Sequence, residues 1–479
     1  MSAHELSMRP DRMQALLAAG FSDLPNGEFL LLTIGAQRSH DVRRWLRQLL
    51  ASGLVVTVDS IGSPARTRIS GMATVAISHA GLAALGIRPS PTHPFPSIFS
   101  EGMGDATRAT QLGDDAAAWR WSDCASGRGT ARQQVAHLLV AHYWSGQAST
   151  VALALFDKAC LADAGLEALR IPVDPYQFQS CGAIEPFGFR DGMAQPSVPG
   201  LHTGADSAYP DTAAGQKPAP EKKKNLVSAG EFVLGQVNEY GQVTYVPDVA
   251  GWDDPQTRFG QDASYIAVRQ IFQDVVALEA FEAGFPAPPA GMPSVIEKMV
   301  GRMRDGSPLC PHDPADPEAF GFRIGDNEGF GCPRGAHIRR ANPRDGLSPH
   351  PEPGAAGTNL HQLLRRGRAY RRVVTEPEQE PAQELAQEQG MFFMALNGDL
   401  ERQFAFVQQR WIANPRFGGL SGESDPLLGQ THRAFTIQRP VGGDRVKGLP
   451  RFTRVVGGGY FLLASLPALD FVSRPDGAG

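Results

Sequence analysis

The sequence predicts an α+β protein built from two ferredoxin-like domains, each an antiparallel sheet with packed helices. The chain of 479 residues is too long for one compact core, because single cores stop growing near roughly 250–300 residues. Its first half reads strand, helix, strand, strand, helix, strand, which is the split βαβ order. The second half repeats this scheme, so we expect a duplicated architecture.

We place an N-terminal domain at residues 1–200, a loop or linker at 201–225 and a C-terminal domain at 226–479. The stretch between the domains, TGADSAYPDTAAGQKPAPEKKK, has no apolar period and ends in three lysines. This composition is typical of a solvated connection.

The elements of the first half follow from the spacing of apolar residues. Residues 28–35 (EFLLLTIG) form a bounded apolar run of strand length, and Ser39 is suited to cap the helix after it. That helix places five apolar residues on one face: Val42, Trp45, Leu46, Leu49 and Leu50. We also expect strands at 54–61, 74–78 and 135–144 and a helix at 151–169.

In the second half, strand-like residues 265–276 run into a helix near Leu278. The stretch 286–344 is rich in loops and longer than a structureless connection should be, which indicates that it builds something. Further strands are expected at 369–374, 391–396 and 460–465. A helix that starts near Asp399 places four apolar residues on one face: Leu400, Phe404, Val407 and Trp411.

Charge and composition exclude several classes of protein. A net charge of −5 and a pI of about 6.2 argue against a nucleic-acid binder, which would carry a basic face. No run reaches the roughly 18 apolar residues of a membrane span, and the N-terminus lacks a signal peptide and a twin arginine. Five widely spaced cysteines fit reduced thiols, so we expect a cytoplasmic protein.

The usual catalytic signatures are absent, since the sequence has no HExxH, GxSxG, GxxxxGK[ST] or CxxCH. Three polar constellations in loop-rich sequence remain. The first, EPFGFRDGMAQP at 185–196, contains Asp191 in an Asp-Gly pair that favours a turn. As a functional group, Asp191 would be a carboxylate on a rigid loop beside Phe187 and Phe189, where an apolar wall raises its pKa and suits it to proton transfer.

The second constellation is GCPRGAHIRRANPRD at 331–345, in which several arginines follow His337. A neutral imidazole beside cations suits an axial iron ligand whose cofactor carries anionic propionates. The same residues suit a phosphate or a surface carboxylate, and a lone histidine is more often structural.

The third constellation is HQLLRRGRAY at 361–370. Its simplest interpretation is a solvated helix end or an edge strand. In a functional interpretation, one of Arg365 and Arg366 points inward as a fixed cation that stabilises developing negative charge.

Together the three stretches resemble the dye-decolorizing peroxidases, a haem family. The GxxDG marker of that family matches GFRDG with Asp191, and its axial-histidine segment matches CPRGAHIRRANPR at 332–344 with His337. Its distal-arginine segment matches Arg365, with Tyr370 five residues further on. All three motifs follow the family's order, and the likeness runs from about residue 28 to 469.

The resemblance implies a dye-decolorizing-peroxidase fold of two ferredoxin-like domains. It also implies one haem b (iron protoporphyrin IX) per chain, held non-covalently and mainly by the C-terminal domain. His337 is then the iron ligand, and Asp191 and Arg365 are the catalytic residues. Arg365 is preferred to Arg366 from its spacing to Tyr370 alone. Cofactor contacts are expected from six residues: His337, Arg339, Arg365, Met391, Phe393 and Asp425.

Two of these expectations have a physical reason. Met391 and Phe393 share one face of a strand by period-2 alternation and would line the distal pocket. Asp425, in ESDPLLG, would accept the Nδ1–H of His337 and make the imidazole a stronger donor. The chain departs from the family pattern at Arg334 and at Met193-Ala194, which affects local packing.

The activity implied is that of a haem peroxidase, a hydrogen peroxide-dependent oxidoreductase. It would reduce hydrogen peroxide and oxidise dyes, phenolics or similar one-electron donors through a ferryl haem radical. Trp411 and Tyr370 are candidates to relay electrons from bulky donors, although most such residues simply pack. No nucleic-acid or membrane partner is expected, and the oligomeric state, a homo-oligomer included, is left open.

Two other hypotheses stay open from the residues. One is a non-catalytic haem-binding, haem-delivery or iron-release protein, which makes no demand on Asp191 together with Arg365. The other is a phosphate-handling enzyme that uses the arginine cluster, which is disfavoured because no phosphate-cradling loop accompanies it.

Overall fold

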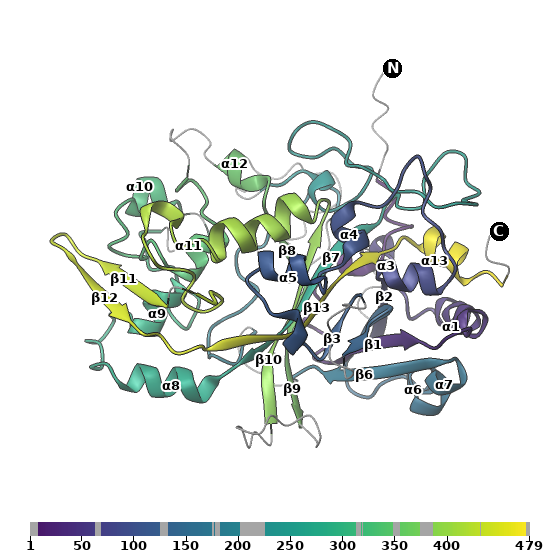
Figure 1. The fold of residues 1–479 in the computed structure, drawn as a ribbon, viewed down its shortest axis with the longest axis horizontal. Coiled ribbons are helices and arrows are strands. Elements are labelled where there is room, and N and C mark those ends of the chain that lie inside the picture. The colour runs from purple at the N-terminus through teal and green to yellow at the C-terminus, as the bar shows by residue number, and fades with distance from the viewer. Residues whose placement is uncertain are drawn as a thin grey trace.

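One large sheet of 11 strands crosses the molecule in the computed structural model (Figure 1). The structure describes residues 8–62, 69–124, 133–174, 177, 183–201, 226–312, 318, 320–347, 355–373, 387–431 and 433–475. Eight strands form the main path, in the spatial order β6 (Leu166–Pro172), β1 (Asn26–Ile34), β5 (Leu138–Trp144), β2 (Gly71–Ile77), β13 (Thr453–Leu463), β7 (Ser264–Gln273), β10 (Gln387–Asn397) and β8 (Leu364–Arg365). Strands β3 (Trp121–Ser122), β4 (Gln134–Val135) and β9 (Arg368–Val373) attach beside this path.

Each half of the sheet has the ferredoxin-like strand order. Counted along the chain within each half, the fourth strand is followed in space by the first, the third and the second. The pairs between these strands are antiparallel. This agrees with the predicted α+β architecture and its duplication.

The two halves meet where β13 pairs with β2, through Leu462 and Ile77. The sheet therefore continues from one half into the other. The division at residues 1–200, 201–225 and 226–479 stays a prediction, and residues 202–225 lie outside the described part of the chain.

The helices are short and lie around this sheet. In the first half they are α1 (Ser39–Ala51), α2 (Val58–Gly62), α3 (His79–Ala84), α4 (Ser97–Glu101), α5 (Ala106–Gln111), α6 (Thr150–Leu155) and α7 (Lys158–Asp163). In the second half they are α8 (Val275–Ala283), α9 (Val295–Val300), α10 (Phe322–Asp326), α11 (His337–Ala341), α12 (Ala355–Asn359), η8 (Glu401–Ala405), η9 (Val407–Ile412) and α13 (Leu466–Ser473). A separate hairpin joins β11 (Ala434–Gln438) to β12 (Gly443–Lys447).

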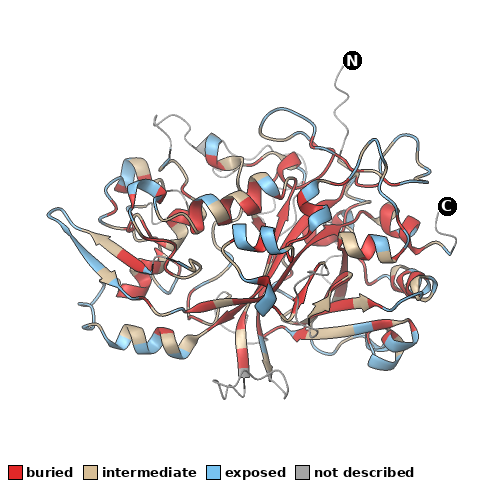
Figure 2. Cartoon of the chain, in the orientation of Figure 1, coloured by how far each residue is buried: buried red, intermediate tan, exposed pale blue. Residues whose placement is uncertain are grey.

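The apolar core occupies both faces of the sheet, and Figure 2 shows its central strands almost entirely buried. On β1, Leu30 and Leu32 belong to one apolar cluster, whereas Phe29 and Leu31 belong to another. This alternation is the period-2 pattern of a strand that is buried on both sides. Of the described residues, no helix has both the length and the apolar character needed to cross a membrane.

Three predicted elements differ from the structure. Residues 54–61 do not form a strand; their second half is helix α2, in which Val58 and Ile61 are both buried in one apolar cluster at a three-residue spacing. β-branched composition favours strands only where a neighbouring strand is present to pair, and here tertiary packing decides.

The helix expected at 151–169 is broken into two, followed by a strand. Asp157 accepts a hydrogen bond from the amide of Ala159 and so starts α7 afresh. Gly165 has φ +76° and ends α7, after which the chain enters β6.

Ser39, which was expected to cap α1, is instead the first residue of this helix. Arg38, which precedes it, makes no capping side-chain hydrogen bond.

The remaining expected elements are present with shifted ends; the largest shift is in the strand expected at 460–465, which is β13 and begins at Thr453. The loop-rich stretch 286–344 holds three short helices, α9, α10 and α11. The apolar face predicted after Asp399 is buried as expected, although its helix has the wider π-type turns of η8 and η9.

Candidate functional site

The loop that carries Asp191 has a backbone fixed by its own side chains. The carboxylate of Glu185 accepts hydrogen bonds from the amides of Phe187 at 3.0 Å and Phe189 at 2.9 Å. Gly188 and Gly192 have φ values of +85° and +78°, which only glycine adopts at little cost. The two glycines of the GxxDG marker therefore satisfy the conformation of this loop, whose hydrogen-bonded turn lies at residues 186–187 and not at the Asp-Gly pair.

Asp191 lines a cavity of about 320 Å³ between the two halves of the sequence. The same cavity is lined by four other residues singled out from the sequence: His337, Arg365, Met391 and Phe393. Near Asp191, the side chain of Gln177 donates a hydrogen bond to its Oδ2 at 3.3 Å. The fold thus brings Asp191 and Met391, about 200 residues apart in the chain, to the wall of one cavity.

His337 is the first residue of α11 and points one ring nitrogen at a buried carboxylate. Its Nδ1 lies 2.9 Å from Oδ2 of Asp425, whose side chain is fully buried. The second oxygen of Asp425 accepts the amides of Leu427 and Leu428 at 2.9 and 2.8 Å. Burial alone would raise the pKa of Asp425, but the charge and hydrogen bond of His337 and the amide of Leu428 hold it below its usual value.

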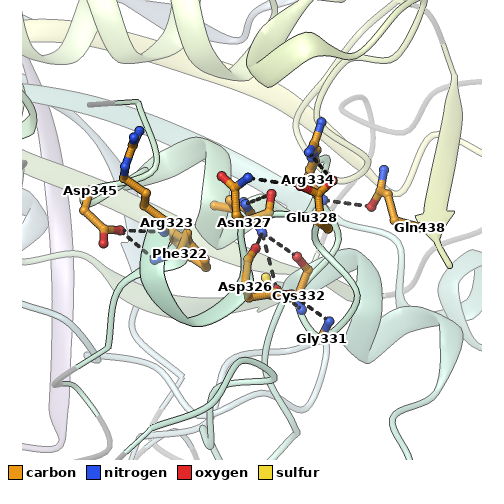
Figure 3. Close-up of polar contacts among 11 residues, drawn as sticks. Phe322, Arg323, Asp326, Asn327, Glu328, Gly331, Cys332, Arg334, Asp345 and Gln438 are labelled. Atoms are coloured by element: carbon orange, nitrogen blue, oxygen red, sulfur yellow. Dashed lines mark hydrogen bonds and ion pairs between the residues drawn. The ribbon is translucent and has the colours of Figure 1, made fainter. Parts of the chain in front are cut away.

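The loop that leads to His337 is held from several sides, as Figure 3 shows. The carboxylate of Asp326 accepts the amides of Gly331 at 3.0 Å and Cys332 at 2.7 Å. The amide of Arg334 donates to Oε1 of Gln438, on the β11–β12 hairpin, at 3.0 Å. These bonds explain how a long, irregular segment fixes the start of α11.

Arg365 ends the short strand β8, which pairs with β10 through Ala395. Its backbone amide donates to Oε1 of Gln195 at 3.1 Å, and the Gln195 amide group donates back to its carbonyl at 3.2 Å. Its guanidinium donates to the carbonyl of Met193, in the loop that follows Asp191. Burial lowers the pKa of Arg365, and the charge of Asp191 opposes this effect.

Arg366 points elsewhere. Its guanidinium donates to the carbonyls of Leu16 and Leu17 at 2.9 and 3.2 Å. It does not line the cavity. Of the two neighbouring arginines, Arg365 is therefore the one that lines the cavity.

Met391 and Phe393 alternate with buried residues along β10. Both line the cavity, whereas Phe392 and Met394 between and beyond them pack in the apolar core on the other face of the sheet. This is the shared face that period-2 alternation predicts.

Comparison with known proteins finds several dye peroxidases. The chain is 28% identical over 314 residues to the dye-decolorizing peroxidase AauDyP1 of Auricularia auricula-judae, covering 60% of this chain and 55% of that protein. It is 30% identical over 309 residues to the multifunctional dye peroxidase DyP2 of an Amycolatopsis strain, covering 60% of each. The chain thus matches little more than half the length of these curated relatives.

The fold extends the likeness to nearly the whole chain. A crystal structure of the DyP-type peroxidase from Auricularia auricula-judae superposes with a TM-score of 0.71 at 23% identity, over 98% of this chain and all of that one. A dye-decolorizing peroxidase whose heme pocket was engineered for asymmetric sulfoxidation gives 0.71 at 22% identity, over 97% and 100%. No protein-family model matches the sequence. The chain therefore has the fold of the dye-decolorizing peroxidases.

Arg339, expected to contact a cofactor, does not line the cavity. Its guanidinium donates to the carbonyls of Asp326 and Cys332, both at 2.9 Å, and lies over the ring of Phe322. The reason is helical periodicity: on α11 the cavity face holds His337 and Ala341, four residues apart, and position 339 points away from it. That expectation is therefore corrected.

Other arginines occupy the cavity wall. Arg302 and Arg344 both line it, and each forms an ion pair with the carboxylate of Glu318 at 3.0 Å. Arg269 of β7 lines it as well and pairs with buried Asp114. Arg344 was visible in the sequence as part of the cluster after His337, but nothing in the sequence marked Arg302 or Arg269.

Glu185 is a functional candidate that the sequence reasoning missed. It lines the cavity and receives a third hydrogen bond, from Nε2 of Gln273 at 2.6 Å. Burial raises its pKa above the usual value, although the hydrogen bonds oppose this. Its position six residues before Asp191, at the start of the same motif, was the available signal.

The two aromatic relay candidates are buried. Trp411 is 7% exposed and Tyr370 is 0% exposed, and the Tyr370 hydroxyl donates to Glu388 at 2.8 Å. Neither ring presents a surface to a bulky donor, so these two candidates do not fit direct electron transfer from such a donor.

Proposed function

We propose that this chain is a haem-dependent peroxidase that reduces hydrogen peroxide and oxidises dyes, phenolics or similar one-electron donors. The observation that carries the proposal is that Asp191, Arg365 and the His337–Asp425 pair meet at one cavity. A carboxylate, a fixed cation and an imidazole backed by an acid are the groups that peroxide chemistry at iron requires.

The residues present fit a haem. Because Nδ1 of His337 is engaged by Asp425, its Nε2 is the nitrogen left to bind iron. The cavity is lined largely by apolar side chains, which suit a porphyrin ring: Phe187, Phe189, Ile271, Val300, Phe320, Met391, Phe393, Val407, Ile412 and Leu427. Arg302 and Arg344 share a single carboxylate, that of Glu318, so the three groups keep one positive charge for propionates.

A bound haem would supply the redox chemistry, and the chain's own side chains would supply proton transfer and positioning. Asp191 is placed to take a proton from hydrogen peroxide and return it to the departing oxygen. Arg365, held by the Met193 carbonyl and by Gln195, is a fixed cation that stabilises negative charge as it develops. The ferryl haem radical implied by the resemblance is part of this proposal, and its spectrum after one equivalent of hydrogen peroxide is the direct test.

The same arrangement favours a peroxidase over a haem carrier. A carrier requires an iron ligand and cations for the propionates, but has no use for a carboxylate and a second cation in the same cavity. The presence of both Asp191 and Arg365 in the cavity lining therefore supports turnover.

Reconstitution with haemin tests the proposal. The loaded protein is expected to show a Soret band and to oxidise 2,6-dimethoxyphenol with hydrogen peroxide well above free haemin. His337→Ala should lose most haem affinity, whereas His40→Ala, which removes an exposed histidine, should not. Failure of the wild-type chain to bind haemin, or turnover no greater than free haemin, would contradict the proposal.

A further inference from the structure

A second cleft, of about 840 Å³, lies outside the cavity described above and shares no lining residue with it. Three segments form its walls: residues 94–98, 238–245 and 398–406. Tyr265 of β7 completes the lining. Nothing in the proposed peroxidase function uses this cleft.

Aromatic rings supply much of its surface. Tyr240 and Tyr245 are 57% and 46% exposed. The Tyr245 hydroxyl donates to the carbonyl of Pro94 at 2.7 Å and so ties two walls together. Phe406 adds a half-buried ring from the segment between η8 and η9. The Phe406 ring stacks on His361, so the exposed rings in the hollow are those of Tyr240 and Tyr245.

Arg402 sets the charge on one side of the cleft. Its guanidinium contacts Oε2 of buried Glu231 at 2.7 Å and Oδ2 of Asp399 at 3.7 Å. The same guanidinium lies 5.3 Å from the centre of the Tyr240 ring. One cation is thus shared by two carboxylates.

Arg108 lies beside the cleft without lining it, and its guanidinium is likewise shared by two carboxylates. It contacts Glu101 at 2.7 Å and Glu401 at 3.6 Å. The charged residues that line the cleft itself are two carboxylates, Asp399 and Glu401, and one guanidinium, Arg402, so carboxylates are in excess there. Excess negative charge beside a hollow raises the local concentration of cations.

Tyr265 adds an unsatisfied polar group. Its side chain is 1% exposed, and among the described residues its hydroxyl has no hydrogen-bond partner. Burial raises its pKa well above 10, and the negative charge of Asp399 acts in the same direction. The hydroxyl therefore stays neutral, and a polar group that reached it would relieve the cost of an unpaired buried donor.

We propose that this cleft binds a planar aromatic cation. Exposed tyrosine faces attract cations and stack on aromatic rings, and the surplus carboxylates select positive over negative charge. The inference is independent of the proposed peroxidase activity, because binding is defined without hydrogen peroxide.

Two tricyclic dyes of similar shape test the proposal, methylene blue as the cation and resorufin as the anion. Each is titrated into the full-length haemin-loaded protein without hydrogen peroxide, with binding followed by fluorescence anisotropy or equilibrium dialysis. Methylene blue is expected to bind more tightly than resorufin, and its affinity should fall as the salt concentration rises.

Variants locate the site. Tyr240→Ala should weaken methylene blue binding by about tenfold, and Glu401→Gln by roughly two- to fivefold. Phe330→Ala and Glu328→Gln are matched controls, because they remove an exposed ring and an exposed ion-paired carboxylate away from the cleft. Equal binding of both dyes, or equal effects of the cleft variants and their controls, would overturn the proposal.

Discussion

Nδ1 of His337 lies 2.9 Å from Oδ2 of Asp425, and this contact joins positions 88 residues apart in the chain. Asp425 has no exposed side-chain surface, and amides of its own turn bind its other oxygen. The carboxylate is therefore fixed before any ligand binds. A fixed acceptor at Nδ1 orients the ring and makes its Nε2 a stronger donor to a metal.

Asp425→Asn should weaken haem binding or peroxide reactivity by about 10- to 100-fold, since the neutral amide no longer polarises the His337 ring. Haemin titration and stopped-flow mixing with hydrogen peroxide measure the two effects. Asp444→Asn, at an exposed site on β12, is the control and should change neither. Unaltered affinity and reactivity in Asp425→Asn would show that the contact does not support an iron ligand.

Asp191→Asn should keep the Soret band but slow the reaction with hydrogen peroxide by about 10²- to 10⁴-fold, because the amide cannot move a proton. The rate is measured by stopped-flow absorption at a series of peroxide concentrations. Asp305→Asn is the matched control, since Asp305 binds the amide of Ser307 outside the cavity lining. A wild-type rate in Asp191→Asn removes this residue from the mechanism.

The sequence predicted the parts of the site whose position follows from a local rule. Strand alternation placed Met391 and Phe393 on one face, and the glycines of GFRDG fit the loop that carries Asp191. The resemblance supplied the partnership of His337 with Asp425, which composition and spacing alone do not contain.

The arginines show where sequence reasoning ended. Arg339 was assigned to the cofactor because it follows His337 closely. Each residue of a helix turns by about 100°, so Arg339, two residues after His337, faces away from the cavity. Arg302 reaches the cavity from a different loop, and only the packed fold shows that it does. Likewise, residues 54–61 have strand composition, yet their burial among residues of another segment makes a helix.

Arg365→Leu and Arg366→Leu should separate catalysis from stability. The first removes the cavity cation and should slow the peroxide reaction while leaving haem bound. The second deprives the carbonyls of Leu16 and Leu17 of a buried donor and should lower the free energy of unfolding by about 1–3 kcal/mol. Urea denaturation and stopped-flow rates measure both variants, and a rate loss confined to Arg366→Leu would reverse the assignment.

Asp262→Asn should stabilise the protein at neutral pH but not in acid. Asp262 is 2% exposed, and burial raises its pKa to about 6. A long hydrogen bond from Gln261 and the charges of Arg12 and Arg9 lower the pKa, but they offset only part of the effect of burial. A raised folded pKa means that the protonated form is favoured in the fold. The contribution of this group is therefore fully present below about pH 4 and is lost as pH rises through about 6.

Asparagine mimics the protonated acid and tolerates the φ of +61° at this position. The free energy of unfolding should thus rise by about 2–3 kcal/mol at pH 7.5 and stay nearly unchanged at pH 4, as measured by urea denaturation at both values. Asp254→Asn is the control and should lower the free energy of unfolding at pH 7.5. Hydrogen bonds from the Gln256 amide and the Thr257 hydroxyl lower the pKa of Asp254, so the fold favours its charged form. A loss of stability in Asp262→Asn that is equal at both pH values would show that Asp262 acts through packing rather than through its charge.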